Sequence, residues 1–274
     1  MTNRPPWRTS LAGSPSFSGS TRTGRSSSTE TSTPSAHGRS GPALPRSTDR
    51  PTLGEPLFLL NLKSYPGHLG PGAVRIAKLL EALGTETGVA TAIAPPVPDL
   101  ARVAASVALP VLSQHVDPGD AGARTGFVPV EAIEAAGARG SLVNHSEHPI
   151  ATVEIEEVVR RLTSRRLVAV VCAADVDQAR RLAETRPPYL AVEPPELIGG
   201  DRAVSTARPQ VVSGTVEAVR SVSPETRVLC GAGVHDRTDV ARALELGAQG
   251  VLVASAVTRA PDAERAIREL LAGF

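Results

Sequence analysis

The chain has 274 residues, and its 29 basic and 28 acidic side chains leave a formal net charge of +1. Residues 1–53 hold 12 Ser, 9 Thr, 7 Pro and 7 Arg but only two acids, Glu30 and Asp49, for a charge of 7 − 2 = +5. Residues 54–274 then carry 29 − 7 = 22 basic and 28 − 2 = 26 acidic side chains, or −4. No run approaches the roughly 18 apolar residues of a membrane span, so composition argues against a membrane protein.

Residues 1–53 have few apolar side chains and no periodicity, so they cannot bury enough surface to offset the entropy of ordering. We therefore predict a disordered tail. Its Arg- and Ser-rich composition is like that of a transit peptide, but no amphipathic stripe supports that interpretation. A flexible extension or a wrongly assigned start codon is favoured. A nucleic-acid-binding arm is disfavoured, because Trp7 and Phe17 are too few to make a stacking surface.

From Gly54 onward, short runs rich in Val, Leu and Ile alternate with stretches of helical spacing. Such runs are typical of buried parallel strands. The predicted strands cover residues 57–62, 89–94, 110–113, 141–144, 167–172, 189–192, 227–230 and 250–254. Two of them contain the cysteines, Cys172 and Cys230, which we expect to be buried, reduced thiols of a cytosolic protein.

Helices are predicted between these strands. Apolar residues at helical spacing mark residues 74–83 and 153–162. Helix starts are expected at Pro129, Pro209 and Pro261. Helix ends are expected at Gly88, Gly137 and Gly247.

Eight strands alternating with about eight helices fit either a closed (β/α)8 barrel or an open doubly wound sheet. No predicted strand is followed by the Gly-x-Gly-x-x-Gly fingerprint of a dinucleotide fold, which disfavours the open sheet. We therefore predict an α/β chain with a disordered tail, residues 1–53, and one barrel domain, residues 54–274.

The first strand ends in Asn61-Leu62-Lys63. Catalytic residues of such barrels lie at the carboxyl ends of the strands, and a period of two points Asn61 and Lys63 to the same side, toward the barrel mouth. A lysine there is costly unless it serves an anion. The alternative is a solvated lysine that has already left the strand.

The fourth strand is followed by His145-Ser146-Glu147. We expect a helix start here, with Ser146 as the N-cap and Glu147 in the first turn. A helix N-terminus disfavours a positive charge on a neighbouring imidazole, and a neutral imidazole can donate a hydrogen bond to a substrate carbonyl. His115 and His148 are weaker candidates, and we expect His115 to hold loop structure.

The sixth strand is followed by Glu193 and a stiff, glycine-hinged loop, residues 194–200. A carboxylate at a strand tip, beside a loop that can close over it, is predicted to be a general base under a lid. The last two strands open into Gly231-Ala232-Gly233 and Ala254-Ser255-Ala256. Small residues leave their N–H groups accessible, as expected of a phosphate site after the seventh and eighth strands.

Together these residues supply one carboxylate base, one neutral imidazole, one lysine and a phosphate cradle. The sequence shows no cofactor fingerprint and no metal-ligand spacing, so neither a cofactor nor a metal is predicted. This set suits proton abstraction next to the carbonyl of a small phosphorylated sugar, through an enediolate.

The same motifs resemble those of the triosephosphate isomerase family, and best its short archaeal-type branch. They are Asn61-Leu62-Lys63 and residues 144–147, 193–199, 230–233 and 253–255. The similarity covers essentially all of residues 57–272. It implies a TIM barrel that interconverts dihydroxyacetone phosphate and D-glyceraldehyde 3-phosphate without a cofactor.

The resemblance also implies roles, which are carried over from that family by motif. Glu193 is the expected base, His145 the electrophile, and Lys63 the cation that stabilises the enediolate. Glu147 is expected to contact the catalytic groups and not the substrate. The expected substrate-binding residues are Asn61, Lys63, Ile198, Gly199, Gly231, Gly233, Ala254 and Ser255.

The chain departs from the family pattern at three places. Gly200-Asp201 replaces the usual Thr-Gly of the lid, which adds a carboxylate near the expected phosphate. His148-Pro149 replaces an Asn-Arg or Arg-Arg pair, so Glu147 is expected to lose a salt partner. Ala256 stands where a glycine is usual.

Two other functions stay open from the sequence. One is an isomerase of another small sugar phosphate, such as a tetrulose phosphate, which the altered lid keeps open. The other is a non-catalytic barrel that binds phosphorylated ligands. The family resemblance further implies a cytoplasmic homo-oligomer, a dimer or tetramer, with no nucleic-acid or membrane partner.

Overall fold

The computed structural model describes residues 51–197 and 203–274. Residues 1–50 of the predicted tail lie outside the described residues, as do Ile198, Gly199 and Asp201 of the predicted lid. Leu53, at the end of the predicted tail, is buried, and its N–H donates to the Tyr189 hydroxyl at 2.9 Å. The barrel unit therefore begins before the predicted boundary at residue 54.

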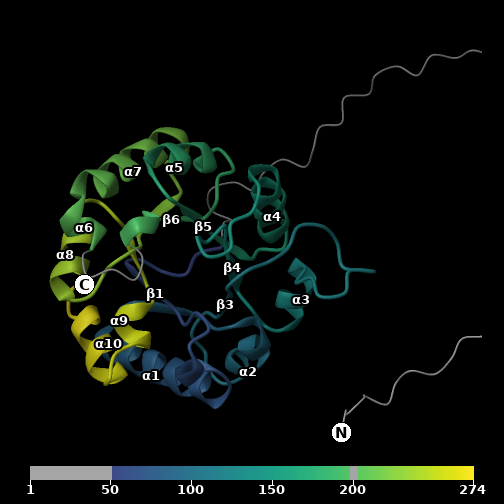
Figure 1. The fold of residues 1–274 in the computed structure, drawn as a ribbon, viewed down its shortest axis with the longest axis horizontal. Coiled ribbons are helices and arrows are strands. Elements are labelled where there is room, and N and C mark those ends of the chain that lie inside the picture. Colours follow the sequence, from purple (N-terminus) through teal and green to yellow (C-terminus); the bar gives the residue numbers. More distant parts are fainter. Residues whose placement is uncertain (1–50, 198–202) are drawn as a thin grey trace, which may run out of the picture. The chain divides into compact units, whose positions relative to one another are not determined.

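A ring of eight parallel strands forms the centre of the domain (Figure 1). The strands are β1 (Leu57–Asn61), β2 (Ala90–Ala94), β3 (Leu112–Ser113), β4 (Gly140–Val143), β5 (Val168–Ala173), β6 (Tyr189–Val192), β7 (Arg227–Cys230) and β8 (Gly250–Val253). These bounds lie within two residues of the predicted ones.

The ring closes at two seams. β1 pairs in parallel with both β2 and β8, which joins the first strand to the last. On the other side, Ile93 of β2 forms a parallel bridge with Val111, and its N–H donates to the Pro110 carbonyl at 3.1 Å. The predicted barrel is thus confirmed, because an open doubly wound sheet would leave its outer strands unpaired.

Helices form the outer layer of the ring (Figure 1). They are α1 (Pro71–Thr87), α2 (Leu100–Ala104), α3 (Val130–Ala135), α4 (Thr152–Ser164), α5 (Val176–Ala183), α6 (Val204–Ala207), α7 (Pro209–Val222), α8 (Arg237–Glu245), α9 (Ser255–Thr258) and α10 (Ala263–Leu271). Pro209 opens α7 and Pro129 immediately precedes α3, as expected from prolines at helix starts. Gly88 ends α1 in the left-handed conformation, with φ 73°.

The core has two layers, which follow from the alternation of side chains along each strand. Leu57 and Leu59 of β1 point into the barrel, where they pack with residues such as Tyr189 and Leu252. Phe58 and Leu60 point outward against the helices. The inward face of β1 continues to Asn61, so the same alternation that fills the barrel brings polar side chains to its mouth.

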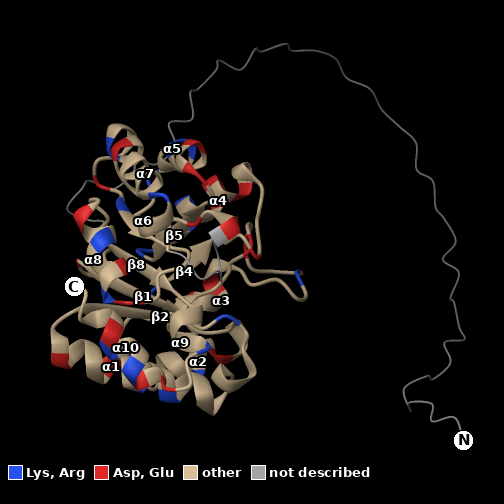
Figure 2. Ribbon diagram, turned by 60° about the vertical axis from the view of Figure 1, so that its left-hand side comes forward, with Lys and Arg blue, Asp and Glu red and all other residues tan. Residues whose placement is uncertain are grey.

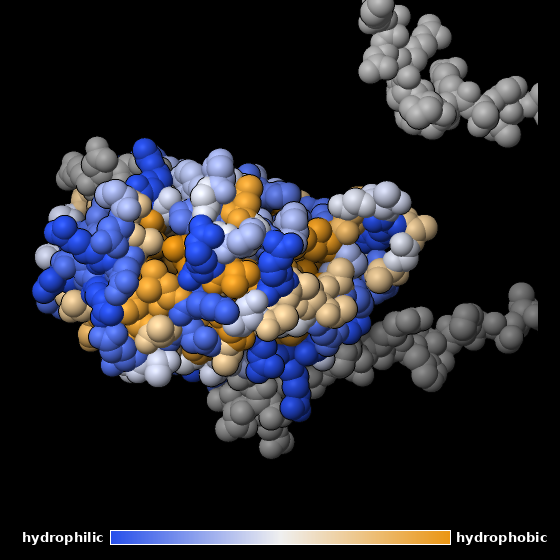
Figure 3. Space-filling view, turned by 90° about the horizontal axis from the view of Figure 1, so that it is seen from below, coloured by the Kyte–Doolittle hydropathy of each residue, from blue (hydrophilic) through white to orange (hydrophobic). Residues whose placement is uncertain are grey.

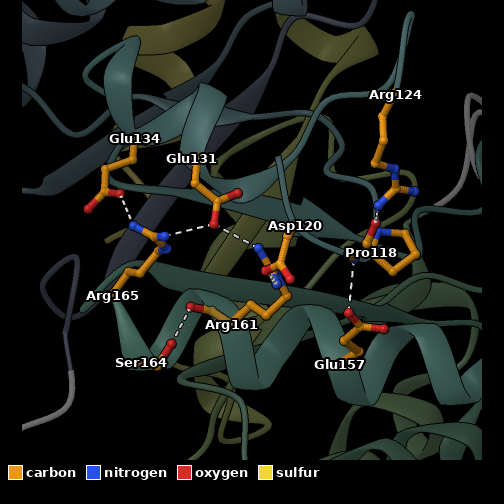
Figure 4. Close-up of polar contacts among 10 residues, drawn as sticks. Pro118, Asp120, Arg124, Glu131, Glu134, Glu157, Arg161, Ser164 and Arg165 are labelled. Carbon is orange, nitrogen blue, oxygen red and sulfur yellow. Dashed lines mark hydrogen bonds and ion pairs between the residues drawn. The ribbon is translucent and has the colours of Figure 1, made fainter. Parts of the chain in front are cut away.

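Charged residues lie mainly on the outer helices and loops (Figure 2). One cluster ties the long loop after β3 to α3 and α4 (Figure 4). Arg161 of α4 pairs with Asp120 in that loop and with Glu131 of α3, the latter at 2.7 Å. Glu157 accepts a hydrogen bond from the Gly119 N–H at 2.9 Å. These contacts hold the loop beside the barrel mouth.

Candidate active site

A small cavity of about 40 Å³ lies at the carboxyl ends of the strands. Its walls are Asn61, Lys63, Tyr65, His145, Glu193, Ala232, Gly233, Val234, Leu252, Val253, Ala254 and Ser255. All three predicted catalytic side chains, Lys63, His145 and Glu193, therefore share one cavity with the loops after β7 and β8.

Glu193 continues the inward face of β6. Its N–H donates to the Ala173 carbonyl at 2.8 Å, which extends the β5–β6 ladder by one bond. The residue is only 5% exposed, and its Oε2 lies 3.7 Å from the His145 Nε2. Behind it in the barrel interior, burial and then the charge of Glu193 raise the pKa of the Cys172 thiol well above its usual range. The carboxylate thus stands in a largely dry site beside a neutral thiol.

His145 does not stand at a helix start, so that prediction is wrong. Residues 145–148 form a turn closed by the His148 N–H on the His145 carbonyl at 2.7 Å, and α4 begins only at Thr152. Pro149 explains this, because the residue before a proline is pushed out of the helical conformation. The backbone N–H of Glu147 donates to His145 Nδ1 at 3.1 Å. That bond leaves Nδ1 unprotonated and places the proton of the neutral imidazole on Nε2.

Lys63 leaves β1 in a left-handed conformation, with φ 50°. Asn61 holds it there, since the Asn61 Oδ1 accepts from the Lys63 N–H at 3.0 Å. Gln114 adds a second support, because its Nε2 lies 3.1 Å from the Asn61 Oδ1 and 3.0 Å from the Lys63 carbonyl. With Oδ1 turned toward these donors, the amide nitrogen of Asn61 is free to face the cavity as a donor.

Glu147 pairs with Lys63, whose Nζ lies 2.7 Å from the Glu147 Oε1. The arginine that the family usually has after this glutamate is replaced by His148-Pro149, but Glu147 still has a cationic partner, which is Lys63. The Lys63 side chain is only 14% exposed, whereas that of Glu147 is 57% exposed. Glu147 thus acts on two catalytic candidates at once, through its carboxylate on Lys63 and through its N–H on His145.

The loops after β7 and β8 line the far wall of the cavity. Within the described part of the chain, the N–H groups of Gly233, Ala254 and Ser255 donate no hydrogen bond to the protein. Gly231 differs from the expectation, because its N–H donates to the Val192 carbonyl at 3.0 Å and it does not line the cavity. A Cβ on Gly231 would lie 2.4 Å from the Glu193 Cγ, so this glycine makes room for the carboxylate.

The sequence predicted no role for two residues that shape this site. Gln114 lies one residue past β3, and its position at a strand tip could have identified it. Asn144 adopts φ 60°, donates from Nδ2 to the Cys172 carbonyl at 3.0 Å and accepts from the Ile150 N–H at 3.2 Å. Asparagine tolerates the left-handed conformation, so Asn144 was the signal for a turn at this strand end.

His115 and His148 lie outside the small cavity. They line an adjoining open cavity of about 710 Å³, where their rings stack with centroids 3.9 Å apart. The His115 Nε2 also lies 3.2 Å from the Asp117 Oδ1, and both residues belong to the loop after β3. Over the described residues, no group of three or more His, Cys, Asp or Glu side chains is placed to hold a metal ion.

Comparison with known proteins points to a single family. The family model described as triosephosphate isomerase matches residues 56–270. The triosephosphate isomerases of Methanothermus fervidus and Methanosarcina barkeri are each 45% identical over 219 residues, which is 80% of this chain and 99% of each relative. That of Caldivirga maquilingensis is 45% identical over 78% of this chain and 96% of its own length. These relatives confirm the expected archaeal-type resemblance.

Solved structures agree on the fold. The triosephosphate isomerase of Bartonella henselae superposes with a TM-score of 0.61 over 73% of this chain and 92% of its own, at 18% identity. At that identity the likeness concerns the barrel alone, while the sequence relatives concern the family. The family model and the sequence relatives together show that the chain belongs to the triosephosphate isomerase family.

Proposed function

We propose that this chain interconverts dihydroxyacetone phosphate and D-glyceraldehyde 3-phosphate by proton transfer through an enediolate. The observation that carries the proposal is the shared cavity of Glu193, His145 and Lys63, with the Glu193 Oε2 3.7 Å from the His145 Nε2. A base and a hydrogen-bond donor on adjacent sides of one small cavity can act on neighbouring carbons of one substrate.

Each side chain has a distinct task. Glu193 takes the proton from the carbon next to the carbonyl and returns it to the neighbouring carbon. His145 donates from Nε2 to the carbonyl oxygen as negative charge develops there, which is the neutral-imidazole role established for this family. Lys63 adds a fixed positive charge, and Asn61 orients the oxygen through its amide. Because Glu193 is nearly fully buried, its charge acts in a poorly solvated site, where electrostatic interactions are stronger.

The phosphate is proposed to bind against the loops after β7 and β8. Gly233, Ala254 and Ser255 line the cavity there and present the N–H groups that the described structure leaves without a protein acceptor. Amides at this position are the usual phosphate site of (β/α)8 barrels. The expected contributions of Ile198 and Gly199 concern residues outside the described part of the chain.

The test compares wild type, Glu193→Asp and His145→Gln with D-glyceraldehyde 3-phosphate as substrate. We expect each substitution to lower kcat by roughly 10²- to 10³-fold, as removal or displacement of a general acid or base does. The matched control is Glu217→Asp on the exposed surface of α7, which we expect to leave kcat unchanged. Circular dichroism checks that all variants fold.

Any of three outcomes would contradict the proposal. One is undiminished turnover in Glu193→Asp, which would remove Glu193 from the base role. Another is turnover of a four-carbon ketose phosphate but not of the triose, which would change the substrate. The third is binding of phosphate ligands without any turnover, which would favour a non-catalytic barrel.

We further propose that the catalytic unit is the barrel domain, residues 54–274 together with the buried Leu53, and that it works as a cytoplasmic homo-oligomer, a dimer or tetramer. Figure 3 supports association, because hydrophobic side chains gather in patches on the face that it shows. Both cysteines are buried free thiols, as suits a reducing compartment. Among the described residues, no helix is long and apolar enough to cross a membrane. Light scattering of the purified protein would contradict the oligomer if it gave the mass of one chain.

A further inference from the structure

Asp239, near the start of α8, joins two segments that are distant in sequence. Its Oδ2 accepts from the backbone N–H of His235 at 2.9 Å, in the loop after β7. Its Oδ1 accepts from the Thr206 hydroxyl at 3.0 Å, and its carbonyl accepts from the buried Ser205 hydroxyl at 3.1 Å. Asp239 therefore bonds to α6 and to the loop 231–235 at the same time.

These two segments also touch each other directly. The N–H of Val204, at the start of α6, donates to the carbonyl of Ala232 at 3.2 Å. With the bonds of Asp239, this contact makes a closed set that spans α6, α8 and the loop between β7 and α8. Burial, and after it the charge of Asp239, raises the pKa of the Cys230 thiol at the end of β7 to about 12. The carboxylate thus lies close to the root of that loop.

The loop needs such support because of its backbone. Ala232 and Gly233 both adopt the left-handed conformation, with φ 66° and 68°. An alanine avoids this conformation when it is free to choose, so contacts from outside the loop must hold it. The same two residues line the small cavity, where the N–H of Gly233 is proposed to meet the phosphate.

A second aspartate on the same helix offers a comparison. Asp236 caps α8, and its Oδ1 accepts from the N–H groups of Thr238 and Asp239. The negative charge of each carboxylate stabilises the N-terminus of α8. Over the described residues, the hydrogen bonds of the Asp236 carboxylate stay within α8, whereas those of the Asp239 carboxylate reach Thr206 and His235 outside it.

We propose that Asp239 is a positioning residue for phosphate recognition, which holds the loop 231–235 against α6 in the shape that presents its N–H groups to the substrate. This inference rests on the proposed function for the identity of the phosphorylated ligand. It adds a residue that touches no substrate and acts through the loop.

The experiment measures two quantities on the full chain: KM and kcat with D-glyceraldehyde 3-phosphate, and Kd for inorganic phosphate by calorimetry. For Asp239→Ala we expect KM and Kd to rise about tenfold, the effect of losing a hydrogen bond to a charged group, with kcat within about threefold of wild type. Asp236→Ala should lower Tm about as much as Asp239→Ala does. It should leave KM and Kd within about twofold of wild type, because it removes a helix cap alone.

The conservative variant Asp239→Asn should restore most of the affinity. Its Oδ1 can accept from the His235 N–H while its Nδ2 donates to the Thr206 hydroxyl. A purely structural role would instead make the rises in KM and Kd follow the fall in Tm across all variants, Asp236→Ala included, and that result would overturn the proposal.

Smaller changes keep the test decisive if Asp239→Ala does not fold. Ser205→Ala and Thr206→Val each remove one of the bonds to Asp239, and each should raise the Kd for phosphate about two- to threefold. An unchanged Kd in both would overturn the proposal. If the wild type binds phosphate but does not turn over the triose, the proposed function fails while the Kd series still decides the role of Asp239.

Discussion

Glu193 and Gly231 share one small volume at the mouth of the barrel. The side chain of Glu193 packs on the backbone of Gly231 from the neighbouring strand end, and a Cβ there would also lie 2.9 Å from the Glu193 Oε1. The absence of a side chain at Gly231 therefore leaves the room that the Glu193 carboxylate occupies. A base displaced from this position would lose its alignment with the reacting carbon.

For this reason we expect Gly231→Ala to lower kcat by roughly 10²-fold, through displacement of the Glu193 side chain. Steady-state kinetics check the effect, and calorimetry should show inorganic phosphate still binding. Gly214→Ala, in the middle of α7, is the matched control. Its added Cβ would meet Val176 at an ordinary 3.7 Å, and a helical Gly→Ala change stabilises by about 0.5–1 kcal/mol. Wild-type activity in Gly231→Ala would show that Glu193 has room to move.

At the scale of elements, the loop after β3 is held by a carboxylate at its base. The N–H of Asp117 donates to the Val128 carbonyl at 2.8 Å, and the Asp117 Oδ2 accepts from the Val128 N–H at 2.6 Å. Partial burial acts to raise the pKa of Asp117, but the bond from Val128 and the neighbouring His115 hold it below its usual value. The charged form of Asp117 therefore stabilises the closed loop.

A depressed pKa gives stability that is present above the ordinary value of about 3.9 and is lost as the pH falls through the folded value. We expect Asp117→Asn to cost about 1 kcal/mol of unfolding free energy at pH 7, and the difference from wild type to shrink below about pH 4. Thermal melts across this range measure it. Glu217→Gln on exposed α7 should show no such trend. A difference that stays constant with pH would mean that the Asp117 charge contributes nothing.

Local sequence patterns were enough to predict several features of the elements and the site. Short apolar runs identified the eight strands, and positions at the strand ends brought Asn61, Lys63 and Glu193 to the barrel mouth, where all three line one cavity. The sequence did not predict the turn at His145. Ser146-Glu147 is a typical helix start, and that pattern was followed although Pro149 disfavours the helical conformation of the residue before it. The roles of Gly231 and Asp239 depend on contacts between elements that are distant in sequence, and a local sequence pattern cannot predict such contacts.

For the whole molecule, the two seams of the barrel are unequal. β1 and β8 pair through four residues each, as do β5 and β6, whereas β2 meets the segment before β3 through one bridge and β3 itself has two residues. Regions with few ladder bonds open more readily than the rest of a fold. We therefore expect the seam between β2 and β3 to open more readily than the β5–β6 pair.

Hydrogen exchange should reveal this difference directly. We expect amides of residues 111–113 to exchange at least about tenfold faster than those of residues 189–192, relative to their intrinsic rates. Mass spectrometry of peptic fragments measures both segments in one experiment. Equal protection would mean that the ring opens only by global unfolding.

The pairing of β1 with β8 also bears on how the protein is made. Gly250 lies beside Leu57, although the two are 250 − 57 = 193 residues apart along the chain. While a ribosome is still synthesising the chain, β1 leaves the exit tunnel long before its final neighbour exists, and its free edge is exposed throughout that time. The cavity that Lys63 shares with the end of β8 and the loop after it therefore cannot form until β8 has left the ribosome.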